Sequence, residues 1–146
     1  MKKVSRHVQV EFGSDEPIYL QIARQIEDLV GNGELKEGDQ LPTVREMATE
    51  LSINFNTVAR AYRLLDESGI ISTQRGRGTY IWKKPSAESR HVLKEAALEN
   101  LLTDMINEIK RRGYSREEVL EALTRIQNSS ADENEKEEKN ENQQTK

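Results

Sequence analysis

The chain has 146 residues, of which 34% are hydrophobic and 33% are charged, so it can form one small hydrophobic core and little more. It contains no Cys, which excludes disulfides and thiolate chemistry, and its two His residues, His7 and His91, do not have the spacing of metal ligands. No apolar run approaches the roughly 18 residues of a membrane-spanning helix, and no signal peptide is visible at the N-terminus. These features favour a cytoplasmic protein without a metal or another cofactor.

The net charge of −4 is distributed unevenly along the chain. Residues 41–85 hold seven Lys or Arg and four Asp or Glu, which gives +3. Residues 1–40, 86–127 and 128–146 have balances of −3, −1 and −3. The centre of the chain is therefore the one basic segment, and it is the place to look for a nucleic-acid partner.

The first forty residues predict a short strand and a helix. Residues 1–13 alternate loosely between apolar and polar side chains, which predicts an edge strand. Asp15, Glu16 and Pro17 are typical of a helix start, and Gly31 and Gly33 end that helix near Asn32. Its buried face has apolar residues at helical spacing: Ile18, Ile22, Ile26, Leu29 and Val30. Residues 35–40 are predicted to be a connecting turn.

The basic segment predicts two short helices joined by a tight turn. Thr43 with Glu46 three residues later forms a capping box, which predicts a helix of about two turns. The turn is predicted at residues 52–53, and Asn54 can cap the next helix. That helix has a buried set at i, i+3, i+4 and i+7, and Gly69 closes it. The buried set is Val58, Ala61, Tyr62 and Leu65.

Two strands are predicted after these helices, at residues 70–74 and 79–82. The tip between them is Arg75-Gly76-Arg77-Gly78, where glycine permits positive φ and arginine offers cations to a phosphate row or a minor groove. A helix-turn-helix followed by such a hairpin is a winged helix-turn-helix. The glycines do not indicate a dinucleotide site, because a strand follows them where that fingerprint requires a helix.

The rest of the chain predicts helices and a tail. Residues 87–112 form a helical pattern that Gly113 breaks, and Ser115 with Glu118 is a second capping box. Two amphipathic helices cannot seal a core alone, so residues 86–127 are expected to pack on the first domain or on another copy. Residues 128–146 are predicted to be a disordered acidic tail. The apolar stripe assigned to dimerisation is Leu98, Leu101, Leu102, Met105, Ile106 and Ile109.

The segments LPTVREMATEL, INFNTVARAYRLLDESGII and RGRGTYI together resemble the winged helix-turn-helix of the GntR family of bacterial transcription regulators. The resemblance covers about residues 10–85 and implies an α+β fold with a DNA-binding domain there. The short C-terminus and the wording NTVARAY resemble the YtrA subfamily, which lacks a large effector-binding domain and dimerises through a short helical segment. It implies a dimeric repressor of an operon such as one encoding an ABC transporter, bound to a pseudo-palindromic operator.

The resemblance also implies which residues contact DNA. Arg45 matches the arginine of the second helix, and Arg75 and Gly76 match the wing tip. The start of the recognition helix carries the base and phosphate contacts. Two positions depart from the family: Phe55 stands where Arg or Pro is common, and Ala59 stands where other branches place a base-reading Arg. With Arg60 on the polar face of the helix and Arg77 at the wing tip, the predicted DNA-binding set is Arg45, Asn54, Phe55, Asn56, Thr57, Arg60, Arg75, Gly76 and Arg77.

Several alternatives stay open from the sequence. Phe55 is either a wedge or thymine-methyl contact, or a piece of packing between helices. The winged domain is either a DNA-binding domain or a protein-interaction module whose basic surface is incidental. A small-molecule effector has little room, because only 61 residues follow Pro85, and a pocket between the C-terminal helices and the wing is the place considered for it. No set of nucleophile, base and orienting group is visible, so an enzyme is not expected.

Overall fold

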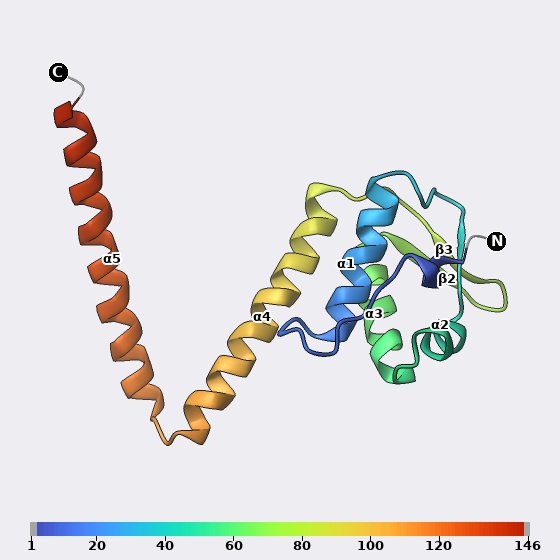
Figure 1. The fold of residues 1–146 in the computed structure, drawn as a ribbon, viewed down its shortest axis with the longest axis horizontal. Coiled ribbons are helices and arrows are strands. Elements are labelled where there is room, and N and C mark those ends of the chain that lie inside the picture. The colour runs from blue at the N-terminus through green and yellow to red at the C-terminus, as the bar shows by residue number, and fades with distance from the viewer. Residues whose placement is uncertain (1–2, 145–146) are drawn as a thin grey trace. The chain divides into compact units, whose positions relative to one another are not determined.

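The structure, a computed structural model, describes residues 3–144. It divides into a first unit that ends at Asn100 and a second unit that begins at Leu101. Figure 1 shows the helices and strands along the chain and labels most of them. Their bounds are Val4–Arg6 (η1, a 3₁₀ turn), Ile18–Gly31 (α1), Gln40–Leu41 (β1), Val44–Leu51 (α2), Phe55–Glu67 (α3), Ile71–Gln74 (β2), Gly78–Ile81 (β3), Ala87–Arg111 (α4) and Arg116–Gln144 (α5).

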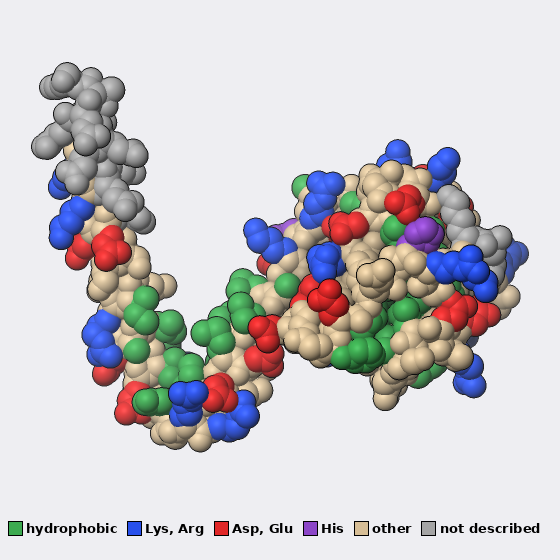
Figure 2. All heavy atoms as spheres, in the orientation of Figure 1, with side chains coloured by type: hydrophobic (Ala, Val, Ile, Leu, Met, Phe, Trp, Pro, Cys, Tyr) green, Lys and Arg blue, Asp and Glu red, His purple; other side chains and the backbone are tan. Residues whose placement is uncertain are grey.

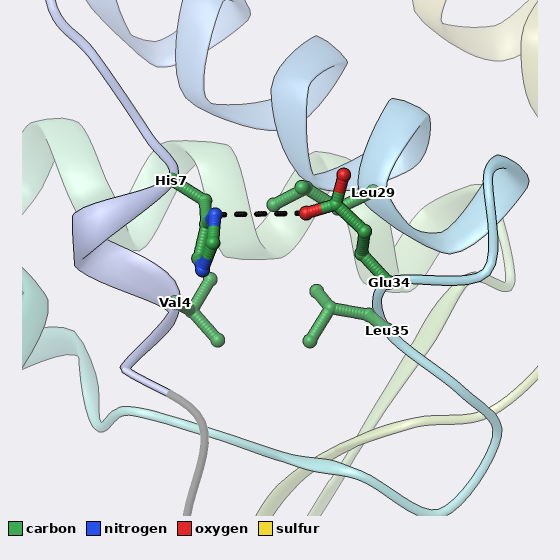
Figure 3. Close-up of a pocket in the computed structure, with 5 residues that line it drawn as sticks. All are labelled: Val4, His7, Leu29, Glu34 and Leu35. Atoms are coloured by element: carbon green, nitrogen blue, oxygen red, sulfur yellow. Dashed lines mark ion pairs between the residues drawn. The ribbon is translucent and has the colours of Figure 1, made fainter.

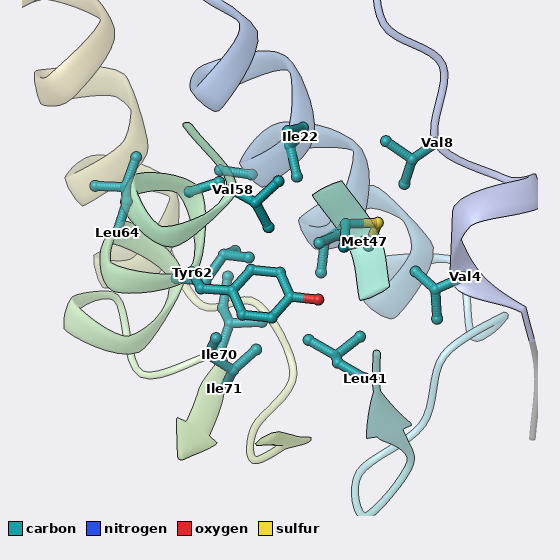
Figure 4. Close-up of a cluster of buried hydrophobic side chains, with 14 of the residues drawn as sticks. Val4, Val8, Ile22, Leu41, Met47, Val58, Tyr62, Leu64, Ile70 and Ile71 are labelled. Carbon is teal, nitrogen blue, oxygen red and sulfur yellow. The ribbon is translucent and has the colours of Figure 1, made fainter. Parts of the chain in front are cut away.

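The core of the first unit lies between α1, α2, α3 and a small sheet. The side chains of Ile22, Met47, Val58 and Leu65 have no exposed surface, and they come from all three helices. Figure 4 shows buried side chains gathered around the ring of Tyr62, whose hydroxyl donates to the carbonyl of Pro42 at 2.7 Å. The predicted apolar faces of α1 and α3 are confirmed, because helical periodicity places those residues on one side.

Local capping sets where α2 and α3 begin, as the sequence predicts. The Thr43 hydroxyl accepts from the Glu46 N–H, and the Glu46 carboxylate accepts from the Thr43 N–H. The Asn54 side chain accepts from the Asn56 N–H at 2.7 Å. Between the helices, Ser52 adopts the left-handed conformation with a φ of 54°, which turns the chain sharply. These contacts confirm both caps and the turn of the helix-turn-helix.

The sheet has three antiparallel strands in the order β1-β3-β2. Ile71 pairs with Ile81 at the base of the wing, and Gln74 pairs with Gly78 near its tip. The first strand, β1, begins at Gln40, the last residue of the predicted turn at residues 35–40. It is only two residues long, so it has no periodicity by which the sequence could reveal it. It forms because Leu41 pairs with Thr79 of the wing.

The predicted edge strand at residues 1–13 is wrong for the described part, and residues 1–2 lie outside it. The chain forms the 3₁₀ turn η1 and then runs along α1 without entering the sheet. Two glutamine side chains of α1 replace a neighbouring strand. The Gln25 amide accepts from the Gln9 N–H at 2.9 Å and donates to the Gln9 carbonyl at 2.7 Å. The Gln21 amide makes the same pair of contacts with Glu11, at 2.8 and 3.0 Å.

The start of α4 belongs to the first unit. Leu93 is buried in its core, and Val92 and Ala96 pack against the same cluster. Packing in this unit therefore includes residues on both sides of the predicted range 10–85, from Val4 to Ala96. The boundaries predicted at residues 85 and 127 remain predictions.

The second unit contains the end of α4 and all of α5. Gly113 has a φ of 86°, and the Ser115 hydroxyl accepts from the Glu118 N–H, so the predicted break and capping box are confirmed. The helix α5 continues to Gln144, and the disordered tail expected at residues 128–146 stays a prediction. Residues 145–146 of that tail lie outside the described part. Composition argues against a packed core here, but Glu, Lys and Gln are helix formers, and no Gly or Pro follows Gly113 to interrupt the helix.

Candidate nucleic-acid interface

The exposed face of α3 carries the residues expected to read DNA. Asn54, Phe55, Asn56 and Arg60 are exposed, and Thr57 is half-buried at the first turn of the helix. The opposite face is locked into the core, so these side chains are presented on a rigid element. Arg63, one turn after Ala59 on the exposed face, is also exposed and extends the polar surface along the helix. It lies outside the predicted contact set.

Arg45 lies at the second position of α2 and is exposed. A surface arginine is often neutralised by an acidic neighbour on the same helix. Within residues 3–144, none of the ion pairs involves Arg45, Arg75 or Arg77. These three guanidinium groups therefore keep their charge available for phosphate oxygens.

The wing tip is shaped by backbone hydrogen bonds. The Arg77 N–H donates to the Gln74 carbonyl at 3.0 Å across the tip, and Gly76 between them has a φ of 77°. The Tyr80 hydroxyl donates to the Arg77 carbonyl at 2.7 Å and holds the tip against β3. Arg75 and Arg77 are both exposed on either side of the glycine. The tip is therefore a defined turn that presents two cations.

Arg60 has a partner that the sequence does not reveal. Its guanidinium carbon lies 3.9 Å from the centroid of the Tyr19 ring in α1. Burial raises the pKa of the Tyr19 phenol, the Arg60 charge lowers it, and the charge of Glu99 in α4 raises it. Tyr19 and Arg60 are 41 positions apart, and no local pattern signals their contact. Arg60 is thus positioned by α1 at the edge of the recognition face.

A pocket is lined by residues outside the predicted DNA-binding set. Figure 3 shows a pocket lined by Val4, Leu29 and Leu35, with His7 and Glu34 facing each other at its side. The His7 Nδ1 lies 3.5 Å from a Glu34 carboxylate oxygen, and both side chains are about half exposed. No group of three or more His, Cys, Asp or Glu residues in the described part could hold a metal ion.

The second unit exposes the apolar stripe expected to dimerise. Leu101, Leu102, Met105 and Ile106 are each about half exposed, as is Leu98 at the end of the first unit. Ile109 is half-buried and lines an open apolar groove with residues of α5. Figure 2 shows hydrophobic side chains gathered on both helices next to their connecting turn. Among the described residues, no helix is both long and apolar enough to cross a membrane.

Comparison with known proteins agrees with this geometry. Residues 18–81 match the profile of the family described as "Bacterial regulatory proteins, gntR family", a range that runs from α1 to the end of β3. The HTH-type transcriptional regulator YhcF of Bacillus subtilis is 42% identical over 113 residues, which cover 77% of this chain and 92% of YhcF. The HTH-type transcriptional repressor YtrA of the same organism is 43% identical over 100 residues, covering 66% of this chain and 77% of YtrA.

A solved structure extends the likeness to the fold. YtrA from Sulfolobus acidocaldarius, a GntR-family transcription factor, is 38% identical and superposes with a TM-score of 0.52. The match covers 64% of this chain and 98% of the archaeal chain. Fold, exposed recognition helix, wing and sequence similarity agree, and the family consists of transcription regulators, not enzymes. This chain belongs to the GntR family of DNA-binding transcription regulators, and within it to the YtrA-like subfamily.

Proposed function

We propose that this regulator is a homodimeric repressor that blocks transcription by occupying an operator. Its recognition helix α3 enters the major groove, and the wing tip meets the flanking minor groove. The observation that carries the proposal is the set of exposed arginines on α2 and the wing tip, Arg45, Arg75 and Arg77, none of which forms an ion pair within the described residues. The similar protein YtrA of Bacillus subtilis is named a repressor, which supports repression over activation. The regulator works in the cytoplasm, where the chromosome is.

The dimer is proposed to form through the C-terminal helices. Leu101, Leu102, Met105 and Ile106 leave an apolar surface in water that a second copy would cover. A two-fold dimer implies a pseudo-palindromic operator with half-sites about one helical turn, roughly 34 Å, apart. An operon encoding an ABC transporter is the proposed target, and a transported small molecule is the class of effector that would relieve repression.

The operator is tested by a footprint on the DNA upstream of the protein's own gene, with and without candidate transporter substrates. We expect a protected two-fold site, with an affinity that falls steeply as salt rises, because phosphate contacts release counterions. Arg45→Ala and Thr57→Ala should each weaken operator binding by about 1–3 kcal/mol if the contact is to a base edge. Arg116→Ala, in α5, is the matched control. Salt-insensitive binding to a protein, with no footprint, would instead favour a protein-interaction module.

The dimer is tested by sedimentation of the full chain. Met105→Glu places a charge on the apolar stripe, and we expect it to shift the chain from dimer to monomer. Phe12→Glu is the matched control, since Phe12 is 70% exposed and lies outside the stripe. A wild-type chain that sediments as a monomer would contradict the proposed assembly.

A further inference from the structure

The recognition helix begins with an apolar side chain in water. Phe55 is the first residue of α3 and is 49% exposed, so it is not packed between helices. Ala59 follows one turn later on the same face and is partly exposed. The two side chains make an apolar strip, and the polar residues of the recognition face lie beside it.

The major groove offers one apolar group, the C5-methyl of thymine, and Ala and Phe side chains are among those that contact it. Residues i and i+4 of a helix are about 6 Å apart, which is roughly two base-pair steps of about 3.4 Å. Asn56 adjoins the strip, and Asn is the side chain that pairs bidentately with adenine N6 and N7. Proteins that insert an apolar side chain between base pairs do so from the minor groove, so a wedge role does not suit Phe55 on a helix in the major groove.

We propose that Phe55 and Ala59 read thymine methyl groups, so that each half-site carries thymine within two base pairs opposite the start of α3. The inference rests on the proposed function, since it requires α3 to enter the major groove. It assigns the two residues that depart from the family pattern a role in choosing the operator sequence. The neighbouring contact of Asn56 with adenine makes the same part of the half-site rich in A·T pairs.

The test begins with selection of the operator from a random pool of DNA duplexes. Each thymine of the selected half-site is then replaced singly by uracil, which lacks the methyl group and pairs identically. For the wild-type chain we expect one or two positions at which uracil weakens binding about fourfold, the value of one buried methyl group. At the position that Phe55 reads, Phe55→Ala should bind the thymine and uracil duplexes equally, within about twofold, while a position that Ala59 reads should stay sensitive. Phe55→Leu should keep the discrimination, because its side chain stays apolar.

Two controls tie the effect to the strip. Phe12→Ala removes the other exposed phenylalanine and should leave the preference for thymine unchanged. A C·G pair in place of the sensitive T·A pair should weaken binding, and 5-methylcytosine at that position should restore part of it for the wild type and not for Phe55→Ala. Circular dichroism checks that Phe55→Ala is folded, which its exposure leads us to expect.

The outcomes are distinguishable. Selection that enriches no sequence would overturn the proposed function and this inference together. An enriched operator at which uracil has no effect on the wild type, or weakens wild type and Phe55→Ala alike at every sensitive position, would overturn the inference alone. If Phe55→Ala keeps full operator affinity but loses binding to another protein, the exposed ring serves a protein partner and the inference is equally wrong.

Discussion

The guanidinium of Arg60 lies over the ring of Tyr19, 3.9 Å from its centroid, and joins the recognition helix to α1. A cation held over an aromatic face at an exposed site contributes about 0.5–1 kcal/mol. The same contact fixes the direction of a side chain on the polar face of α3 that is predicted to contact DNA. Tyr19 therefore positions Arg60 from outside the recognition helix.

We expect a double-mutant cycle on Tyr19→Leu and Arg60→Ala to give a coupling of about 0.5–1 kcal/mol in the free energy of unfolding. Tyr19→Phe keeps the ring and is the matched control. If Arg60 meets DNA, Tyr19→Leu should also weaken operator binding. Urea unfolding and operator titration measure the two effects, and strictly additive losses of stability would contradict the stacked contact.

The glutamine contacts of the N-terminal segment predict a measurable share of stability. Gln21→Leu removes two hydrogen bonds to Glu11 and one to the Glu16 carbonyl, and we expect it to lower the free energy of unfolding by about 1–3 kcal/mol. Gln9→Ala should change stability by less than about 0.5 kcal/mol, because only the backbone of Gln9 takes part in the pairing. Hydrogen exchange provides the local measurement: the Glu11 N–H should lose protection in Gln21→Leu. Unchanged protection there would show that the pairing is absent in solution.

The turn of the wing tip depends on positive φ at two glycines, 77° at Gly76 and 110° at Gly78. Gly76→Ala should destabilise the tip by about 1–2 kcal/mol, because a Cβ is unfavourable at a φ of 77° and no neighbouring atom lies within 4 Å to add a clash. Gly76→Asn should destabilise the tip less than Gly76→Ala, since Asn tolerates a positive φ. Gly13→Ala is the control, because Gly13 has neither a positive φ nor a close neighbour. Thermal unfolding and operator titration measure the effect, and a Gly76→Ala variant equal to the wild type in both would show that the tip turns differently in solution.

Tyr62 predicts a loss of stability at alkaline pH. Burial raises the pKa of its phenol, and the charges of Glu46 and Glu50 add to that shift. The folded state keeps the proton above about pH 10, where the unfolded chain begins to lose it, so the free energy of unfolding falls as pH rises beyond that point. Tyr62→Phe should be less stable by about 1 kcal/mol at pH 8, because the bond to Pro42 is lost. The gap should close between about pH 10 and 11 in urea titrations, and a constant gap would contradict the shift.

The features of this protein that depend on neighbours a few residues apart can be predicted from the order of its residues. Thr43 and Glu46 are one helical turn apart, so their capping box is visible in the order of residues and fixes where α2 begins. The same holds for the apolar faces of α1 and α3. The basic centre of an otherwise acidic chain also favours a nucleic-acid partner.

Contacts between distant segments follow from the tertiary fold and are not visible in the order of residues. Gln21 and Gln25 turned a predicted strand into a segment bound to α1, because their amides satisfy the backbone groups that a strand would have paired. The two-residue strand β1 exists because Leu41 meets Thr79 across the wing. Tyr19 reaches Arg60 across 41 positions. Such contacts depend on which surfaces the packed core brings together, and the spacing of residues along the chain does not predict them.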